Sequence, residues 1–189
     1  MMKAIEQLQI TSPIMRHTMT AREGPPDRAI RFDKAAKAIA TSIARNAPVK
    51  EGGSHCPVIV EGPKDERALR ELGFTGTIEK VNKGWSRSRL IAYLHDTYGM
   101  RNIVDKGPPV IVAMDWDRTG GQLQRFLRDR LMSLDVTVDE EMRTVLMRVM
   151  KPEGRTIESL LPHAPKLVPL ISSYIDANQI SPEGSVETP

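Results

Sequence analysis

The sequence contains one cysteine, few aromatic residues and no long apolar run. Cys56 alone cannot form an internal disulfide, which excludes a disulfide-built secreted domain and is typical of a protein in the reducing cytoplasm. The longest apolar runs, such as residues 110–114, are far shorter than the roughly 20 residues that a membrane helix needs. The start of the chain carries no apolar signal core, so we expect neither secretion nor membrane insertion.

Aromatic residues make up only 4% of the 189 residues, so the core must be built from aliphatic side chains and methionine. An apolar content of 40% is sufficient for such a core, and 27% charged residues indicate a well-solvated surface. The net charge is only +3, but the basic excess lies in the first two thirds of the chain. A polyanionic partner would meet a favourable field there, although a mixed solvated surface explains the charge equally well.

Hydrophobic periodicity predicts alternating strands and helices from residue 57 onward. Such alternation is typical of βαβ units, and therefore of an α/β fold with a parallel sheet of about four strands flanked by helices. We expect strands over residues 58–60, 77–81, 110–114 and 136–138. We expect helices over residues 28–46, 64–72, 86–98, 122–131 and 140–150, with a short one over 157–161.

This pattern divides the chain into three parts. Residues 1–56 form a lead-in and an amphipathic helix, residues 57–138 the sheet core, and residues 139–189 a helical extension with a disordered tail. We expect Asp27 to cap the first helix and Ile30 to belong to its apolar stripe. The final helices should be interrupted by three prolines: Pro162, Pro165 and Pro169.

Three acidic residues lie at or just beyond the ends of predicted strands. Glu61 ends the first strand, Asp115 ends the third, and Asp117 follows two residues later. Because the carboxyl ends of parallel strands line a common crevice, we expect these carboxylates to lie close together if the two strands are neighbours. Oxygen ligands without a nearby Cys or His suit Mg²⁺ better than zinc. The alternative is structural, because an acid after a strand often caps a helix, and Asp117 is placed to do so.

Two segments around these acids carry a family resemblance. Residues 58–65 read VIVEGPKD, and residues 110–120 read VIVAMDWDRTG. In order, spacing and strand context they resemble the Toprim domain. That domain is shared by type IA and type II topoisomerases, bacterial-type primases, overcoming-lysogenization-defect nucleases and the ribonuclease that matures five-S ribosomal RNA. The arrangement is most similar to the small stand-alone Toprim proteins of archaea, which also place a helix before the first strand.

The resemblance implies a Rossmann-like Toprim sheet and a role for each motif residue. Glu61 matches the glutamate that acts as general acid or base in phosphoryl transfer. Asp115 and Asp117 match the pair that coordinates Mg²⁺, with Mn²⁺ as the alternative ion. Gly62 would let the backbone turn closely beneath a substrate, and Gly120 would open the next helix with free N–H groups facing an anion.

One position departs from part of the family. Type IA topoisomerases carry a further acid two residues after the second aspartate, where this chain has Thr119. The chain also has no room for the strand-passage domains of a topoisomerase, nor for the zinc-binding and helicase-contacting parts of a full primase. We therefore exclude a complete enzyme of either kind.

A basic segment at residues 80–89, KVNKGWSRSR, follows the second predicted strand. Cations around a tryptophan are typical of surfaces that guide nucleic acid, whereas the alternative is a solvated loop with the ring against the core. We expect these side chains to contact nucleic acid: Lys64, Lys83, Trp85, Arg87, Arg89 and Arg118.

Two classes of function fit this sequence. The first is a Mg²⁺-dependent nuclease or nucleotidyl-transfer protein acting on RNA or DNA. The second is a non-catalytic nucleic-acid-binding module within an RNA-processing, ribosomal or replication complex. A receiver-like phosphorylation domain shares the sheet but needs paired acids after its first strand, which residues 61–63 do not supply.

Overall fold

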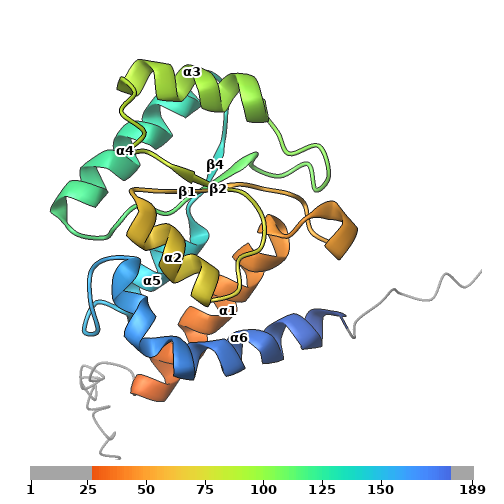
Figure 1. Cartoon of the computed structure of the whole chain (residues 1–189), viewed down its shortest axis with the longest axis vertical. Helices are drawn as coiled ribbons and strands as arrows, with labels where there is room; N and C mark the ends of the chain where they lie inside the picture. Colours follow the sequence, from red (N-terminus) through yellow and green to blue (C-terminus); the bar gives the residue numbers. More distant parts are fainter. Residues whose placement is uncertain (1–26, 180–189) are drawn as a thin grey trace, which may run out of the picture.

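The computed structural model describes residues 27–179 of the chain, which form a four-stranded parallel sheet covered by helices on both faces (Figure 1). The strand order is β2-β1-β3-β4, and every pair is parallel. This confirms the α/β class and the four strands predicted from the sequence. The strands are β1 (Val58–Val60), β2 (Ile78–Lys80), β3 (Val110–Val112) and β4 (Val138–Asp139).

Side chains of the central strand β1 alternate between two hydrophobic clusters. Val58 and Val60 belong to the cluster under one face of the sheet, and Ile59 belongs to the cluster under the other. In Figure 1 the two layers of helices lie on opposite sides of the sheet. One layer consists of α3 (Arg87–Tyr98) and α4 (Arg118–Met132). The other consists of α1 (Arg28–Asn46), α2 (Pro63–Glu71), α5 (Glu141–Val149), the 3₁₀ helix η2 (Glu158–His163) and α6 (Ala164–Gln179), while the short 3₁₀ turn η1 (Val49–Glu51) follows α1.

Local sequence determines where several helices begin and end. The hydroxyl of Ser86 caps α3 by accepting the N–H of Arg89 at 3.3 Å. Gly99 ends that helix in a left-handed conformation with φ 68°, which glycine adopts without strain. Pro63 opens α2 at a position where its missing N–H costs nothing.

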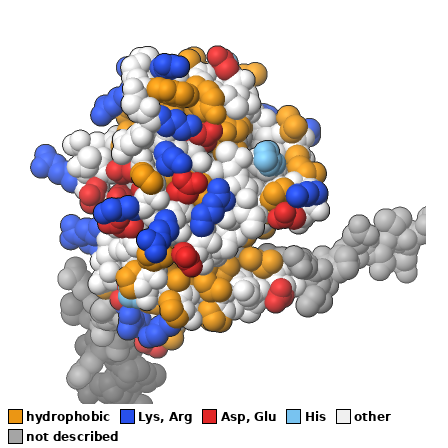
Figure 2. Space-filling view, viewed as in Figure 1, with side chains coloured by type: hydrophobic (Ala, Val, Ile, Leu, Met, Phe, Trp, Pro, Cys, Tyr) orange, Lys and Arg blue, Asp and Glu red, His pale blue; other side chains and the backbone are white. Residues whose placement is uncertain are grey.

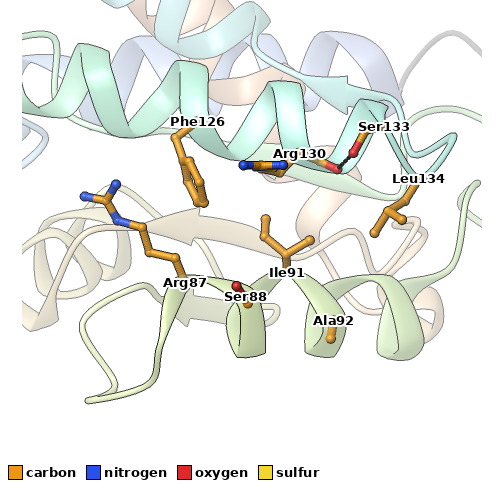
Figure 3. A pocket seen from close by; sticks show the side chains of 8 residues that line it. All are labelled: Arg87, Ser88, Ile91, Ala92, Phe126, Arg130, Ser133 and Leu134. Carbon is orange, nitrogen blue, oxygen red and sulfur yellow. Dashed lines mark hydrogen bonds between the residues drawn. The ribbon is translucent and has the colours of Figure 1, made fainter.

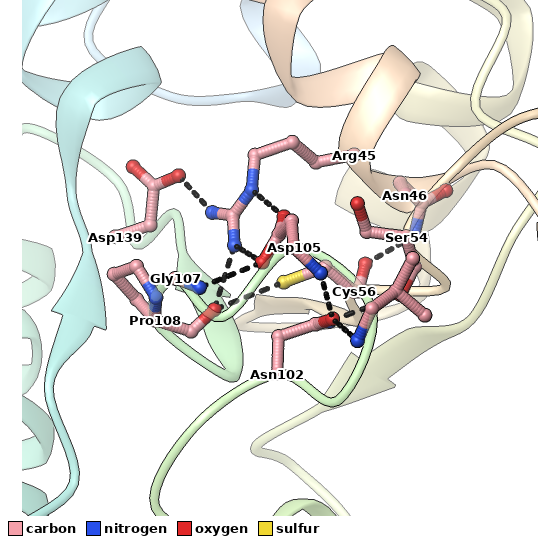
Figure 4. A network of polar contacts seen from close by, with 10 residues as sticks. Arg45, Asn46, Ser54, Cys56, Asn102, Asp105, Gly107, Pro108 and Asp139 are labelled. Carbon is pink, nitrogen blue, oxygen red and sulfur yellow. Dashed lines mark hydrogen bonds and ion pairs between the residues drawn. The ribbon is translucent and has the colours of Figure 1, made fainter.

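A polar network around Arg45 ties the end of α1 to the amino ends of the strands (Figure 4). The guanidinium donates to Asp105 at 2.8 Å and to the carbonyl of Pro108 at 2.7 Å, and it also pairs with Asp139 on β4. The side-chain amide of Asn46 donates to the carbonyls of Cys56 and Thr77, both at 2.9 Å. These structural contacts lie at the edge of the sheet opposite the strand ends that carry the acids.

The last helix corrects the sequence prediction. The three prolines do not break the end of the chain: α6 continues for 16 residues, with Pro165 in its first turn and Pro169 inside it. A proline in the first turn removes no hydrogen bond. Leu167 and Ile171 are buried in the same core as α1, and this packing stabilises the helix despite Pro169.

The first helix also differs in detail from the prediction. The bounds of α1 are those predicted from the sequence, but the side chain of Asp27 makes no capping hydrogen bond. Ile30, predicted in the apolar stripe, is 50% exposed, because the buried face of α1 is centred on Ala35 and Ile39. Helix α4 begins at Arg118, four residues earlier than predicted, directly after Asp117.

Parts of the sequence prediction lie outside the described residues. These are the lead-in up to residue 26 and the disordered tail over residues 181–189. Among residues 27–179, no helix combines the length and the apolar character needed to cross a bilayer.

Candidate metal and nucleic-acid site

Glu61 and Asp115 meet at the carboxyl ends of two neighbouring strands. The register of β1 and β3 pairs Val58 with Ile111 and Ile59 with Val112, so the residues that follow run side by side. The N–H of Asp115 donates to Oε1 of Glu61 at 3.2 Å. The two strands are neighbours, which was the condition for these carboxylates to lie close together.

A fourth carboxylate, Asp65, joins this edge from the first turn of α2. It is only 6% exposed, and its Oδ2 accepts the N–H of Gly62 at 2.9 Å. Asp65 belongs to the first motif, but no role was predicted for it. Its position three residues after Gly62, at the start of a helix, is typical of the acidic member of a capping box and was the available signal.

Asp117 is exposed and caps helix α4. Its Oδ1 accepts the N–H of Gly120 at 2.7 Å. Helix capping, the alternative role stated for Asp117 from the sequence, is therefore confirmed. The expectation that the N–H of Gly120 would be free to face an anion is therefore wrong. Glycine is needed there for a different reason, because a Cβ on Gly120 would lie 2.3 Å from the carbonyl oxygen of Asp115.

Burial and mutual repulsion raise the pKa values of the acids at this edge. Burial raises the pKa of Asp115 to about 7, and the charges of Asp65, Glu61 and Asp117 add to the shift, while the N–H of Ile157, 2.8 Å from Oδ1, opposes it. Burial is also the main cause that raises the pKa of Glu61, followed by the charges of Asp65 and Asp117. The pKa of Asp65 is likewise raised by burial. Burial thus disfavours the charged forms of these acids, and the neighbouring charges add to the effect for Asp115 and Glu61.

Arg143 of α5 holds the backbone beneath these acids. Its Nε donates to the carbonyl of Met114 and its Nη2 to that of Asp115, both at 2.8 Å. The guanidinium also lowers the pKa of Glu61, although burial lowers the pKa of Arg143 itself. No spacing signal in the sequence pointed to Arg143, which is a single arginine in a helix 28 residues after Asp115.

The ligand chemistry at this edge fits a hard cation, although the ligands are not gathered around one point. Among residues 27–179, no group of three or more His, Cys, Asp or Glu side chains is arranged to hold a metal ion. The hydrogen bonds of Glu61, Asp115 and Asp117 to backbone N–H groups each engage one carboxylate oxygen, and each carboxylate has two. Carboxylate oxygens are ligands that Mg²⁺ prefers, and a bound cation would stabilise the charged forms of Glu61 and Asp115, whose pKa values are raised.

The basic segment is divided between two places rather than forming one surface. Lys83 and Arg89 both flank the ring of Trp85, with Nζ at 5.2 Å and Cζ at 4.6 Å from its centroid. That ring packs edge-on against Tyr93, with the centroids 5.2 Å apart, and is half-buried. Arg87 instead lies over Phe126 of α4, with Cζ 5.0 Å from the ring centroid.

The remaining predicted contacts flank the acidic edge. Lys64 is exposed and pairs with Glu158 at 3.5 Å, and Arg118 is exposed at the start of α4. A Cβ on Gly62 would have no neighbour closer than the amide nitrogen of Asn82 at 3.9 Å. Gly62 itself is buried, and that contact is an ordinary van der Waals distance. Figure 2 shows acidic side chains gathered where α2 and α4 begin, with Lys and Arg side chains around them.

Comparison with known proteins identifies relatives, although no family model matches the chain. A UPF0292 protein of Thermococcus onnurineus is 37% identical over 105 residues, which cover 54% of this chain and 69% of that protein. The chain belongs to the UPF0292 family. A UPF0292 protein of Methanosarcina acetivorans is 27% identical over 111 residues, covering 58% of this chain and 69% of the relative.

A solved structure, described as a putative protein from Aquifex aeolicus, is 21% identical with a TM-score of 0.44, covering 64% of this chain and 93% of the other. The UPF0292 name states no ligand, reaction or partner. The chemistry of this member of the family therefore has to be argued from the residues at its acidic edge.

Proposed function

We propose that this UPF0292 protein is a stand-alone Toprim protein that carries out Mg²⁺-dependent phosphodiester chemistry on nucleic acid, as a nuclease or a nucleotidyl-transfer protein. The observation that carries this proposal is the meeting of Glu61 and Asp115 at the ends of β1 and β3, with Asp65 and Asp117 beside them. Carboxylates that raise one another's pKa are costly to maintain unless a cation compensates their charge.

Asp115, Asp117 and Glu61 are the residues that would hold Mg²⁺, or Mn²⁺ in its place. When bound, the ion would neutralise charge on a phosphate. The backbone contacts from Arg143 to Met114 and Asp115 fix the end of β3 and so limit where the aspartate can point. Asp117 is held by the first turn of α4, which sets its distance from that strand.

Glu61 is the residue best placed to move a proton. The pKa of Glu61 is raised and so lies closer to neutral pH than that of an ordinary glutamate. A group exchanges protons most effectively when its pKa is near the ambient pH. Glu61 is only partly buried, so a substrate can reach it from solvent. Lys64 and Arg118 stand near the two helix starts and would contact phosphate groups from either side.

Labelled RNA and DNA oligonucleotides, incubated with Mg²⁺ or Mn²⁺, test the proposal. We expect cleavage or extension by the wild-type chain and its loss in Glu61→Gln and Asp115→Asn. Asp96→Asn is the matched control, because Asp96 is an exposed acid in the last turn of α3. Equal activity in the two site variants would overturn the proposal, whereas metal-independent binding without turnover would support the non-catalytic binding module instead.

A further inference from the structure

A groove of about 410 Å³ lies between α3 and α4, on the face of the sheet that those helices cover (Figure 3). Ile91 of α3 and Leu134, just beyond α4, supply apolar surface. Phe126 projects from α4 toward α3. Arg87 and Arg130 stand at the rim, and no carboxylate lines the groove.

The arginines and the phenylalanine form one unit. The guanidinium carbons of Arg87 and Arg130 lie 5.0 and 6.0 Å from the centre of the Phe126 ring. Planar cations around an aromatic ring offer stacking surfaces for flat groups and paired donors for phosphate oxygens. The groove therefore has the chemistry to hold a polyanion that carries planar bases.

Helix α4 begins at the acidic edge and runs along the groove. Asp117 caps α4, and Phe126 follows nine residues later, which places it about 13 Å along the helix axis. Arg130 lies a further turn away, about 20 Å from the cap. A strand of about four or more nucleotides covers such a distance when it binds an elongated site.

We propose that the α3–α4 groove binds single-stranded nucleic acid and leads it to the acidic edge, with a base against Phe126 and phosphates on Arg87 and Arg130. This inference rests on the proposed function, because it assigns the substrate class of that same site. A groove of about 410 Å³ accepts one or two bases, and a duplex keeps its bases paired and unavailable for stacking on a side chain. An acidic peptide would satisfy the two arginines but would leave Phe126 without a planar partner.

Fluorescence anisotropy with labelled 12-nucleotide probes tests this inference. All variants are made in the Glu61→Gln background and measured without divalent ions, so that binding is read separately from turnover. We expect Phe126→Ala to weaken binding of the single strand about tenfold through loss of stacking. Phe126→Leu keeps the apolar packing and should show most of the same loss. Arg87→Gln and Arg130→Gln should each reduce the salt slope of log Kd by about one.

Arg148→Gln is the control, because Arg148 is an exposed arginine on α5, in the layer on the opposite face of the sheet. It should bind as the parent does. Unchanged affinity in the Phe126 and arginine variants would overturn the inference, as would equal binding of duplex, or binding of an acidic peptide that displaces the strand. Failure of the proposed function has a different signature, which is the absence of metal-dependent turnover in the wild-type chain whatever its affinity for the single strand.

Discussion

The N–H of Asp115 donates to the side chain of Glu61 at 3.2 Å, across the carboxyl ends of β1 and β3. One acid thus positions the other through its backbone, although their charges repel. The hydrogen bond needs only an oxygen acceptor on residue 61, whereas the proposed chemistry needs a carboxylate. The two roles of Glu61 can therefore be separated by substitution.

Glu61→Gln should keep the fold and lose the activity. The amide oxygen still accepts the N–H of Asp115, and removal of the charge relieves repulsion from Asp65 and Asp117, so the free energy of unfolding should stay equal or rise. Glu61→Ala lacks the acceptor and should lose about 1 kcal/mol. Urea unfolding measures both. A glutamine variant less stable than the alanine variant would contradict this separation of roles.

Asp115 should lower the stability of the metal-free protein as the pH rises from about 4 to about 7. The pKa of Asp115 is about 7 in the folded chain against an ordinary value of 3.8, so the folded state binds more protons than the unfolded state throughout this window. Asp115→Asn should remove this loss, which after allowance for solvent screening is about 1–2 kcal/mol. Thermal unfolding in EDTA at several pH values measures the difference between the two proteins.

Mg²⁺ should reverse the same loss. Because the ion binds the deprotonated acids, its addition should raise the melting temperature more at pH 8 than at pH 5. Asp96→Asn, which removes an exposed acid in the last turn of α3, should respond as the wild type does. An equal shift at both pH values would contradict a role for these carboxylates in binding the ion.

Two glycines of the motifs should respond differently to alanine. Gly120→Ala places a Cβ 2.3 Å from the carbonyl oxygen of Asp115 and should cost about 1–3 kcal/mol, because backbone must move. Gly62→Ala meets nothing closer than 3.9 Å and should change stability by less than about 0.5 kcal/mol. If a substrate approaches the backbone at Gly62, that variant should still lose nucleic-acid affinity. Denaturant unfolding and anisotropy on the same samples compare the two.

Arg143→Met should lower the free energy of unfolding of the protein by about 2–4 kcal/mol. The substitution leaves the carbonyls of Met114 and Asp115 without their donor in a buried setting. Arg148→Met on the same helix is the control, because Arg148 is exposed. Equal stability of the two variants would show that Arg143 does not hold the end of β3.

The alternation of apolar runs and helical stripes was enough to predict the sheet, because β1 and β3 are short, fully buried apolar runs and helices separate the strands along the chain. The end of the chain could not be read in this way. Pro165 and Pro169 predicted a break in the helix. The helix forms nevertheless, because Leu167 and Ile171 are buried against α1, and such tertiary packing cannot be seen in the local sequence. Local rules describe what a segment prefers and not what it packs against.

The candidate site was predicted in part. Glu61 and Asp115 could be placed together because strand ends in a parallel sheet share an edge. Arg143 and Phe126 come from helices whose facing residues depend on how those helices pack, so neither could be assigned to the site from the sequence. The motif that contains Gly120 was located correctly, but the role predicted for this glycine was wrong. Its close approach to the backbone of Asp115 depends on the three-dimensional structure.

Binding of the metal tests the central claim most directly. Isothermal titration of the wild-type chain with Mg²⁺, and with Mn²⁺ in parallel, should show saturable binding that Glu61→Gln and Asp115→Asn each weaken at least tenfold, while Asp96→Asn leaves it unchanged. Absence of binding to the wild type, or binding that survives in both site variants, would contradict the assignment of the acidic edge as a metal site.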